Sequence, residues 1–275
     1  MSWRVSAKIA RRELRGGLSG FRILIACLAL GVAAIAAVGT VRSGIQAGLV
    51  SKGAELLGGD AEAEFTYRFA NQSEHMWMQR HATTVSQIVD FRSMAVVERN
   101  GKIERGLTQI KAIDEFYPLY GTPKLRSGEE FSKVFVQTGD HPPALMEPLI
   151  ADRLALGIGD TFKLGTTTFI LADIITLIPD GAGDGFGLGP RTLVMTKDLE
   201  KSGLIAPGTL FSTKYRLKLP QDTNLDTLAK LVELDLSSSG LRWRDAREAA
   251  PGISAFIDRL GSFLILVGLA GLAVG

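Results

Sequence analysis

The chain has 275 residues, which suits one or two folded domains, and a formal net charge of +2. Its cations are spread along the chain except for a concentration at the N-terminus, so the charge pattern does not indicate a nucleic-acid partner. The single cysteine, Cys27, excludes a disulfide framework, and His75, His81 and His141 lack the spacing of a zinc site. We therefore expect neither a disulfide-stabilised domain nor a bound metal or cofactor.

Residues 1–20 have the pattern of a basic amphipathic helix. Apolar side chains recur at spacings of three and four and form one stripe, beside a stripe of basic side chains. We expect this helix to lie on the inner leaflet, with its tryptophan at the headgroups and its cations on anionic lipid. An orientation signal without further role is the alternative. The residues expected at the membrane surface are Trp3, Arg4, Lys8, Arg11 and Arg15.

Residues 21–41 are predicted to be a transmembrane helix. The run from Ile23 to Val41 contains nineteen residues without a charge. As a helix it would extend about 28 Å, close to the hydrocarbon thickness of a bilayer. A buried core helix and a cleaved signal peptide are the alternatives, but this run is longer than the apolar part of a signal peptide. Six basic residues precede it and two follow in the next twenty positions, which predicts a cytoplasmic N-terminus.

Residues 42–260 are predicted to form a periplasmic α+β domain with a stalk helix at each end. The apolar stripe of the first span continues beyond the membrane and ends at Gly58-Gly59. We expect a strand over residues 63–69 next, and then a short helix over 73–81 with Ser73 as its N-cap.

The clearest local pattern in this domain is a β-hairpin. Its strands cover residues 91–99 and 102–113, and Asn100-Gly101 supplies the positive φ angles of a type I′ turn. Alternation and turn residues predict further short elements along the chain. These are strands over 134–136, 161–164, 167–178, 191–195, 215–219 and 241–245, and helices over 147–156, 197–202 and 225–236, the last capped by Asn224.

Residues 179–190 contain alternate glycines but do not fit a phosphate-binding loop. No Gly-Lys-Ser or Gly-Lys-Thr follows, and the glycines do not match the Gly-x-Gly-x-x-Gly frame. Asp180 and Asp184 lack the spacing and the closing Glu of an EF-hand calcium site. We expect a surface loop in which Phe186 and Leu188 contact a partner or a lipid substrate.

Residues 261–275 are uncharged again and are expected to begin a second transmembrane helix. Fifteen residues are fewer than the ~20 that a span needs, so we expect this chain to be the first part of a longer multi-pass protein. The expected location is the bacterial inner membrane, with the main domain in the periplasm.

Four stretches, taken in order, resemble the FtsX-like, MacB-type ABC transporter permeases, and among them the YbbP-type group. They are Ala10–Gly17 with Leu30–Ala33, Leu154–Gly165, Leu188–Arg191, and Trp243–Arg247 followed by Phe256–Leu260. The likeness covers nearly the whole chain, and the ordered set is more specific than any one motif. It implies a periplasmic core domain of two lobes, with residues 60–140 and 205–250 in one lobe and 141–204 in the other.

The resemblance also implies a permease subunit without enzyme activity of its own. In such systems a separate cytoplasmic ABC ATPase dimer binds ATP, and its closure moves the membrane helices and the outer domain. The other implied partners are the lipid bilayer and a periplasmic protein, lipid or lipoprotein substrate.

Two other classes fit parts of the sequence. A two-span sensor with an extracytoplasmic ligand-binding domain would need a signalling module after residue 275. A membrane-anchored hydrolase would need a nucleophile, but the Gly-x-Ser-x-Gly motif is absent. Asp152, Asp160 and Asp173 are better explained as turn or solvated residues. We therefore prefer the transport subunit.

Overall fold

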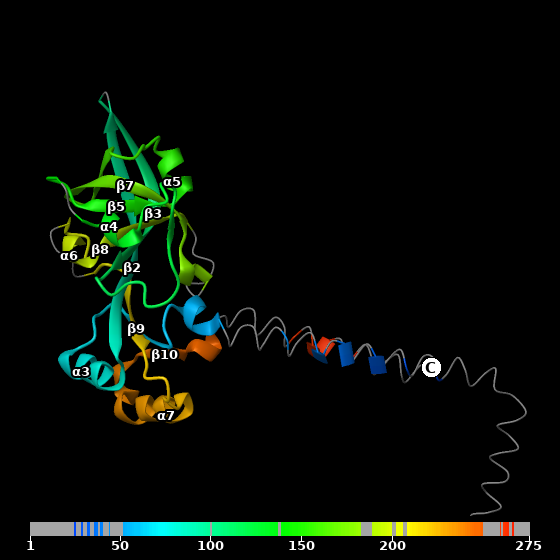
Figure 1. Cartoon of the computed structure of the whole chain (residues 1–275). Coiled ribbons are helices and arrows are strands. Elements are labelled where there is room, and N and C mark those ends of the chain that lie inside the picture. The colour runs from blue at the N-terminus through cyan, green and yellow to red at the C-terminus, as the bar shows by residue number, and fades with distance from the viewer. Residues whose placement is uncertain are drawn as a thin grey trace, which may run out of the picture. The chain divides into compact units, whose positions relative to one another are not determined.

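The computed structural model describes residues 52–249 except 100, 137–138, 183–188, 200–201 and 206–207, together with some helical positions within 25–44 and 259–266 (Figure 1). The chain divides into two compact units, and residues 49–250 form the larger one. Within the described part of the chain, no helix is long and apolar enough to cross a bilayer. The spans predicted over residues 21–41 and 261–275 fall mainly outside the described residues and stay predictions.

A ten-stranded sheet forms the frame of this unit. Its strands follow the order β10-β1-β9-β2-β3-β8-β5-β7-β4, and β6 pairs with both β2 and β7. The strands are β1 Ala61–Thr66, β2 Thr84–Arg99, β3 Lys102–Ile113, β4 Lys124–Leu125, β5 Pro143–Met146, β6 Thr161–Leu164, β7 Thr167–Leu177, β8 Arg191–Met195, β9 Phe211–Lys218 and β10 Arg242–Asp245. The helices are α3 Gln72–His81, α4 Phe131–Val134, α5 Pro148–Arg153, α6 Thr196–Leu199 and α7 Leu225–Asp235, with 3-10 turns η1 Pro179–Ala182, η3 Ser237–Ser239 and η4 Ala246–Glu248.

Strands β10, β1 and β9 and the first half of β2 form one lobe, which α3 and α7 cover (Figure 1). Side chains in a strand alternate between the two faces of the sheet, so every second residue points toward these helices. Phe65, Tyr215 and Leu217 lie on the covered face, in one buried cluster with Trp77 of α3 and Leu228 of α7. We call this part the helical lobe.

The second half of β2 belongs to a closed barrel. Strands β2, β3, β8, β5, β7 and β6 pair in a ring, and β6 closes it by pairing with β2 at Ala95 and Val96 and with β7 along its length. Apolar side chains from all six strands meet in one buried cluster, which Ile150 and Leu154 of α5 also join. We call this part the barrel lobe.

The outer face of the barrel carries a third apolar cluster. Ile88, Ile113 and Leu193 belong to it, and each is next in sequence to a residue of the barrel interior. The segment from Tyr117 to Phe135, which includes β4 and α4, covers this cluster. One face of the sheet is thus covered by helices and the other by a long connecting segment.

Most of the predicted elements are present, and the α+β class is confirmed. In the hairpin Arg99 pairs with Lys102 and Gly101 has a φ of 73°, although β2 begins at Thr84 rather than at residue 91. Asn224 caps α7 as predicted, by accepting a hydrogen bond from the Thr227 N–H at 3.0 Å. Local patterns of this kind are reliable because the turn or cap residue itself sets the backbone conformation.

Two local predictions are wrong. The strand predicted over 134–136 is absent, because α4 ends at Val134 and its apolar residues, at helical spacing with Phe131, cover the third cluster. The N-cap of α3 is Asn71, not Ser73: Asn71 accepts from the Glu74 N–H at 2.9 Å, and Glu74 accepts from the Asn71 N–H at 2.7 Å. This reciprocal pair is a capping box.

The predicted lobe boundary at residue 140 is also wrong. Strands β2 and β3, which the prediction assigned to the first lobe, supply two of the six barrel strands. β3 pairs in parallel with β8, so residues on both sides of the predicted boundary share one interior. The two lobes exist as separate apolar clusters, but the long strand β2 runs through both.

Replacing Asn71 by alanine should lower the free energy of unfolding by about 1 kcal/mol, because the Glu74 N–H loses its acceptor. Ser73→Ala is the matched control, since the Ser73 hydroxyl is exposed and only donates to Asn71 Oδ1. Urea denaturation followed by circular dichroism measures both variants. Equal losses in the two variants would contradict the assignment of the cap.

Replacing Gly106 by valine should destabilise the barrel lobe by about 1–3 kcal/mol, because its Cβ would lie 2.5 Å from Ile150 Cδ1 in a packed core. Gly101→Asn is the control: this turn position has a φ of 73° and open space around it, and asparagine tolerates that conformation. Thermal unfolding of both variants tests this, and a lower midpoint for Gly101→Asn than for Gly106→Val would count against the packing described.

Candidate functional site

The two ends of residues 49–250 meet beside strand β1. Residues 52–57 are helical and lead to Gly58, which has a φ of 78°. A Cβ on Gly53 would lie 1.9 Å from the carbonyl oxygen of Ala246, so the helix touches η4 where only glycine fits. The Ala246 N–H donates to the Asp60 carbonyl at 2.9 Å. The segment that enters the domain is thereby held against the segment that leaves it, and we call this contact the end junction.

Asp60 fixes the end junction to the rest of the sheet. Its carboxylate accepts hydrogen bonds from the Tyr120 hydroxyl at 2.7 Å and from the Leu219 N–H at 2.8 Å. Burial and the neighbouring carboxylate both raise the pKa of Tyr120, so its hydroxyl stays protonated and donates. A covering loop, strand β9 and the entering segment are joined at one side chain.

Five charged side chains are buried next to the end junction, each of them at most 8% exposed. Arg216 lies between two carboxylates: its Nε is 3.2 Å from Glu62 Oε2, and its NH1 contacts Asp180 Oδ2. Arg244 donates to Glu62, and Lys111 Nζ lies 2.5 Å from Asp180 Oδ2. Every cation therefore has a carboxylate partner. We call these five residues the buried charge cluster.

Strand register brings part of the buried charge cluster together. Glu62 on β1 pairs with Arg216 on β9 and with Arg244 on β10, so the three side chains form a row on the face opposite the helices. Asp180 comes from η1 and also accepts from the Tyr117 hydroxyl at 2.6 Å. The carboxylate of η1 is thus held by residues of β3, of β9 and of the segment that follows β3.

Gly58 connects the end junction to the buried charge cluster. A Cβ at this position would lie 2.2 Å from Arg216 NH1 and 2.9 Å from Asp180 Cβ. The entering helix therefore ends in direct contact with the guanidinium and the aspartate. Any larger residue at position 58 would have to displace a buried ion pair.

The electrostatics of the cluster indicate a structural role. Burial alone would raise the pKa of Glu62, but the positive charges of Arg216, Lys214 and Arg244 outweigh it and lower the pKa below the ordinary value of 4.5. The carboxylate is therefore held charged and is occupied by two arginines. Such a group orients strands and is a poor proton acceptor for chemistry.

The local sequence pattern does not predict this cluster. Residues 215–219 were predicted to form a half-buried strand by their alternation of polar and apolar side chains, yet the polar Arg216 is only 1% exposed. Asp180 was considered only as a calcium ligand, and it is buried among cations instead. Alternation correctly predicts which residues share a face, but it does not say that a second layer covers the polar face.

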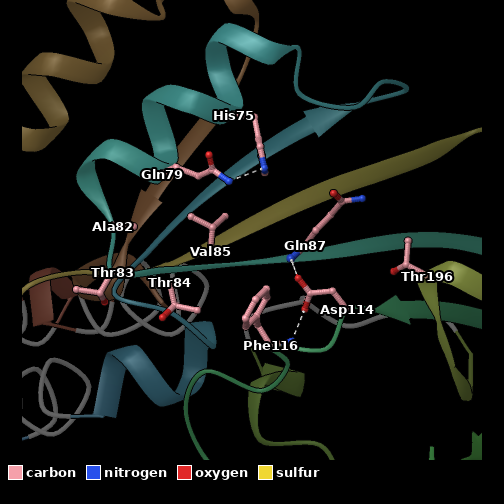
Figure 2. Close-up of a pocket in the computed structure, with 10 residues that line it drawn as sticks. All are labelled: His75, Gln79, Ala82, Thr83, Thr84, Val85, Gln87, Asp114, Phe116 and Thr196. Atoms are coloured by element: carbon pink, nitrogen blue, oxygen red, sulfur yellow. Dashed lines mark hydrogen bonds between the residues drawn. The ribbon is translucent and has the colours of Figure 1, made fainter.

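A pocket of about 440 Å³ lies between the helical lobe and the barrel lobe (Figure 2). His75 of α3 and Thr196 of α6 are on opposite sides of it, and Gln87 of β2 lies between them. Asp114 and Phe116, just after β3, also line it. Asp114 accepts from the Gln87 N–H at 2.6 Å, and burial raises its pKa despite these hydrogen bonds. We call this the seam pocket.

The residues predicted to act at the membrane surface or in the glycine-rich loop lie outside the part of the chain that the structure describes. The described residues contain no group of His, Cys, Asp and Glu that could hold a metal. Asp160 lies in a turn, as predicted, and accepts from the Gly157 N–H at 2.9 Å. Asp173 is buried and accepts from the Ile174 N–H at 2.6 Å, so its assignment as a turn or solvated residue is wrong. The residues outside the description are Trp3, Arg4, Lys8, Arg11, Arg15, Phe186 and Leu188.

Replacing Glu62 by glutamine should lower the free energy of unfolding by about 3 kcal/mol at neutral pH, because Arg216 and Arg244 lose their charged partner in a buried site. The folded pKa of Glu62 lies below its ordinary 4.5, so this stability is present above pH 4.5 and is lost as the pH falls through the folded pKa. The variant should lack that part of the acid dependence. Urea denaturation of the variant and of the unmodified protein, from neutral pH to below pH 4.5, measures both the loss of stability and its dependence on pH.

The matched control for Glu62 is the exposed Glu129, whose replacement by glutamine should leave the urea midpoint unchanged. The structural role assigned to the cluster would be contradicted if Glu62→Gln were as stable as the unmodified protein, with the same acid dependence.

Comparison with known proteins identifies the family. The MacB-like periplasmic core domain matches residues 23–233. An uncharacterized ABC transporter permease, YbbP of Escherichia coli (strain K12), is 25% identical over 245 residues, which cover 88% of this chain and 28% of the relative. This chain thus spans little more than a quarter of that relative's length.

Solved structures to which the chain is similar are more distant in sequence. The periplasmic region of MacB from Actinobacillus actinomycetemcomitans has 13% identity and a TM-score of 0.46, over 74% of this chain and 97% of that one. The extracellular domain of the noncanonic ABC-type transporter YknZ from Gram-positive bacteria has 10% identity and a TM-score of 0.42, over 67% of this chain and 98% of that one. Because the family match covers most of the sequence, the chain belongs to the MacB-like periplasmic core domain family of ABC transporter permeases.

Proposed function

We propose that this chain supplies a membrane helix and an outer domain to a permease subunit of an ABC transporter. ATP hydrolysis by a separate cytoplasmic ATPase dimer changes the conformation of the outer domain, which moves or extracts a lipid, a lipoprotein or another hydrophobic substrate. Family membership and the permease name of the E. coli relative support this proposal. The permease itself has no enzyme activity, and ATP is bound by the partner.

The observation that carries the proposal is the end junction. A domain driven by membrane helices needs its two connections to be close together and stiffly attached, so that displacement at the membrane reaches the fold. Gly53 contacts Ala246 without room for a Cβ, and Gly58 contacts Arg216 in the same way. A movement of the entering helix therefore acts on the leaving segment and on the buried charge cluster together.

The membrane arrangement is part of the proposal. Residues 21–41 cross the inner membrane, residues 261–275 begin a second span, and the N-terminus is cytoplasmic. Residues 1–20 lie on the inner leaflet, and the glycine-rich loop contacts a periplasmic partner or the substrate. The charge asymmetry of the flanks and the uncharged runs support this arrangement. A two-span sensor is not favoured, because the matched family is that of MacB-like periplasmic core domains and the E. coli relative is named a permease.

Affinity purification of the full-length protein from detergent-solubilised membranes should recover a soluble ABC ATPase. Reconstituting the two in lipid should raise the ATPase activity.

In the Gly53→Val variant the ATPase should still be recovered, but most of the stimulation should be lost, because the new side chain separates the two ends of the domain. Mass spectrometry and a phosphate-release assay measure these outcomes.

Gly139→Ala is the control, since a Cβ at this position meets no atom within 4 Å, and it should keep full stimulation. Recovery of a response regulator in place of an ATPase would overturn the transport proposal in favour of the sensor. Full stimulation in Gly53→Val would leave the transporter intact and overturn the role given to the end junction.

A further inference from the structure

The segment from Tyr117 to Phe135, which we call the strap, covers an apolar strip on the outer face of the barrel lobe. The strip contains one aliphatic side chain from each of five neighbouring strands. Neighbouring strands lie about 4.8 Å apart, so the strip extends roughly 19 Å across the sheet. The strap therefore keeps a long aliphatic face out of solvent. The residues of the strip, each at most 1% exposed, are Ile88 of β2, Ile113 of β3, Leu193 of β8, Leu145 of β5 and Ile175 of β7.

The strap itself is only shallowly buried. Within it, only Tyr117, Pro123 and Leu125 are buried. Helix α4 has no side-chain cap and no buried residue, and Phe131 and Phe135 stay partly exposed where they lie against the cluster. Segments with few buried apolar side chains open at a lower free energy than the core beneath them. This difference allows the strap to separate from a barrel that stays folded.

The middle of the strap is hydrogen-bonded to strand β7 at the edge of the sheet. The Arg126 N–H donates to the Ile174 carbonyl at 2.8 Å, and the Thr176 hydroxyl donates to the Lys124 carbonyl at 3.0 Å. Lys124, Arg126 and Thr176 are exposed, so water replaces these hydrogen bonds when the strap separates. The connection at β4 is therefore reversible.

The start of the strap is attached to the segment that enters the domain. The Tyr120 hydroxyl donates to the Asp60 carboxylate at 2.7 Å. A Cβ on Gly121 would lie 3.2 Å from Glu55 Cγ and 2.5 Å from Pro179 Cβ. The strap thus contacts the entering helix and η1 at adjacent residues. A displacement of the entering helix would act directly on the strap.

The chemistry of the strip favours a hydrocarbon chain over a peptide. Strands β3, β8, β5 and β7 use their backbone groups to pair with one another beneath the strip. A peptide laid across them would find no backbone partner, and burying its amide groups would cost free energy. An alkyl chain carries no such groups and is stabilised by every CH₂ that it buries. The occupant that fits is therefore the alkyl chain of a lipid.

We propose that the apolar strip binds the alkyl chain of a membrane lipid when the strap separates from it, and that the entering helix drives this separation. The strap and the alkyl chain cover the same side chains in turn, so the site is closed until the strap moves. The drive rests on the proposed function, because it needs a displaced membrane helix, whereas binding to the strip does not.

The test uses the full-length protein with Cys27→Ser in lipid nanodiscs. The probe is a fatty acid that carries a diazirine on its alkyl chain, and mass spectrometry locates the crosslinked peptides after illumination. Phe131→Ala removes a ring that lies 5.9 Å from the ring of Tyr117, so the strap should be open more often. Crosslinking to residues 143–146 and 191–195, beneath the strap, should then rise roughly tenfold, because the apparent affinity follows the open fraction.

Phe69→Ala is the matched control. It removes a partly exposed ring that lies 5.2 Å from the ring of Phe211, outside the strap, and should leave the crosslinking unchanged. Thermal unfolding of both variants shows that each is folded. Equal crosslinking of the peptides beneath the strap in the two variants would overturn the binding strip.

A disulfide tests the movement of the strap. Lys124 and Leu177 are exposed and lie opposite each other in antiparallel β4 and β7, which is a pairing that a disulfide can join. In the Phe131→Ala background, Lys124→Cys with Leu177→Cys should lose the crosslinking when oxidised and regain it with dithiothreitol. Cysteines at Glu98 and Ile103, opposite each other in the hairpin, should have no effect. Unchanged crosslinking in the oxidised strap variant would contradict the role of the strap.

The last arm adds the ATPase partner and ATP. Crosslinking of the strip should rise when the strap is free and should not rise when the disulfide holds it. If no ATPase is recovered, the proposed function fails, but the result for Phe131→Ala still decides whether the strip binds an alkyl chain. A recovered and stimulated ATPase without any rise in crosslinking would overturn the drive by the entering helix.

Discussion

A single carboxylate, that of Asp180, holds the start of the glycine-rich loop to both lobes of the domain. It pairs with Lys111 of the barrel lobe and with Arg216 of the helical lobe. Burying charges costs free energy that the attraction between them only partly recovers, so such a network adds little net stability. Its contribution is specificity: all its charges are paired only when β1, β3, β9, β10 and η1 occupy their native positions. We therefore interpret the cluster as the feature that sets the arrangement of the two lobes.

The same cluster explains why the end junction is stiff. The helix over residues 52–57 ends at Gly58, whose backbone lies directly against the Arg216 guanidinium. On the other side, Asp60 is held by Tyr120 and by the backbone of Leu219. A displacement of this helix therefore meets buried, fully paired groups at once. Packed interiors deform little, so the displacement is passed to the strands rather than absorbed.

The sequence predicts the features of this fold that local chemistry decides. Asn100-Gly101 sets the hairpin, Asn224 caps α7, and alternation finds most of the strands. It does not predict which distant strands pair, so the closure of the barrel by β6 against Ala95 and Val96 could not be read from it. The buried charge cluster was missed for the same reason, because Glu62 and Asp180 meet Arg216 only through long-range contacts that local spacing does not encode.

The position of the seam pocket has a consequence for the outer domain. His75 belongs to the helical lobe and Thr196 to the barrel lobe, and strand β2 runs through both. A ligand that contacts both lobes can favour one arrangement of them only by as much as its affinity differs between arrangements. The lobes are joined covalently by β2 and electrostatically by Asp180, and both connections oppose a change of arrangement. Occupancy of the pocket would then adjust the domain slightly, whereas under the proposed function a displacement at the end junction would act on its whole frame.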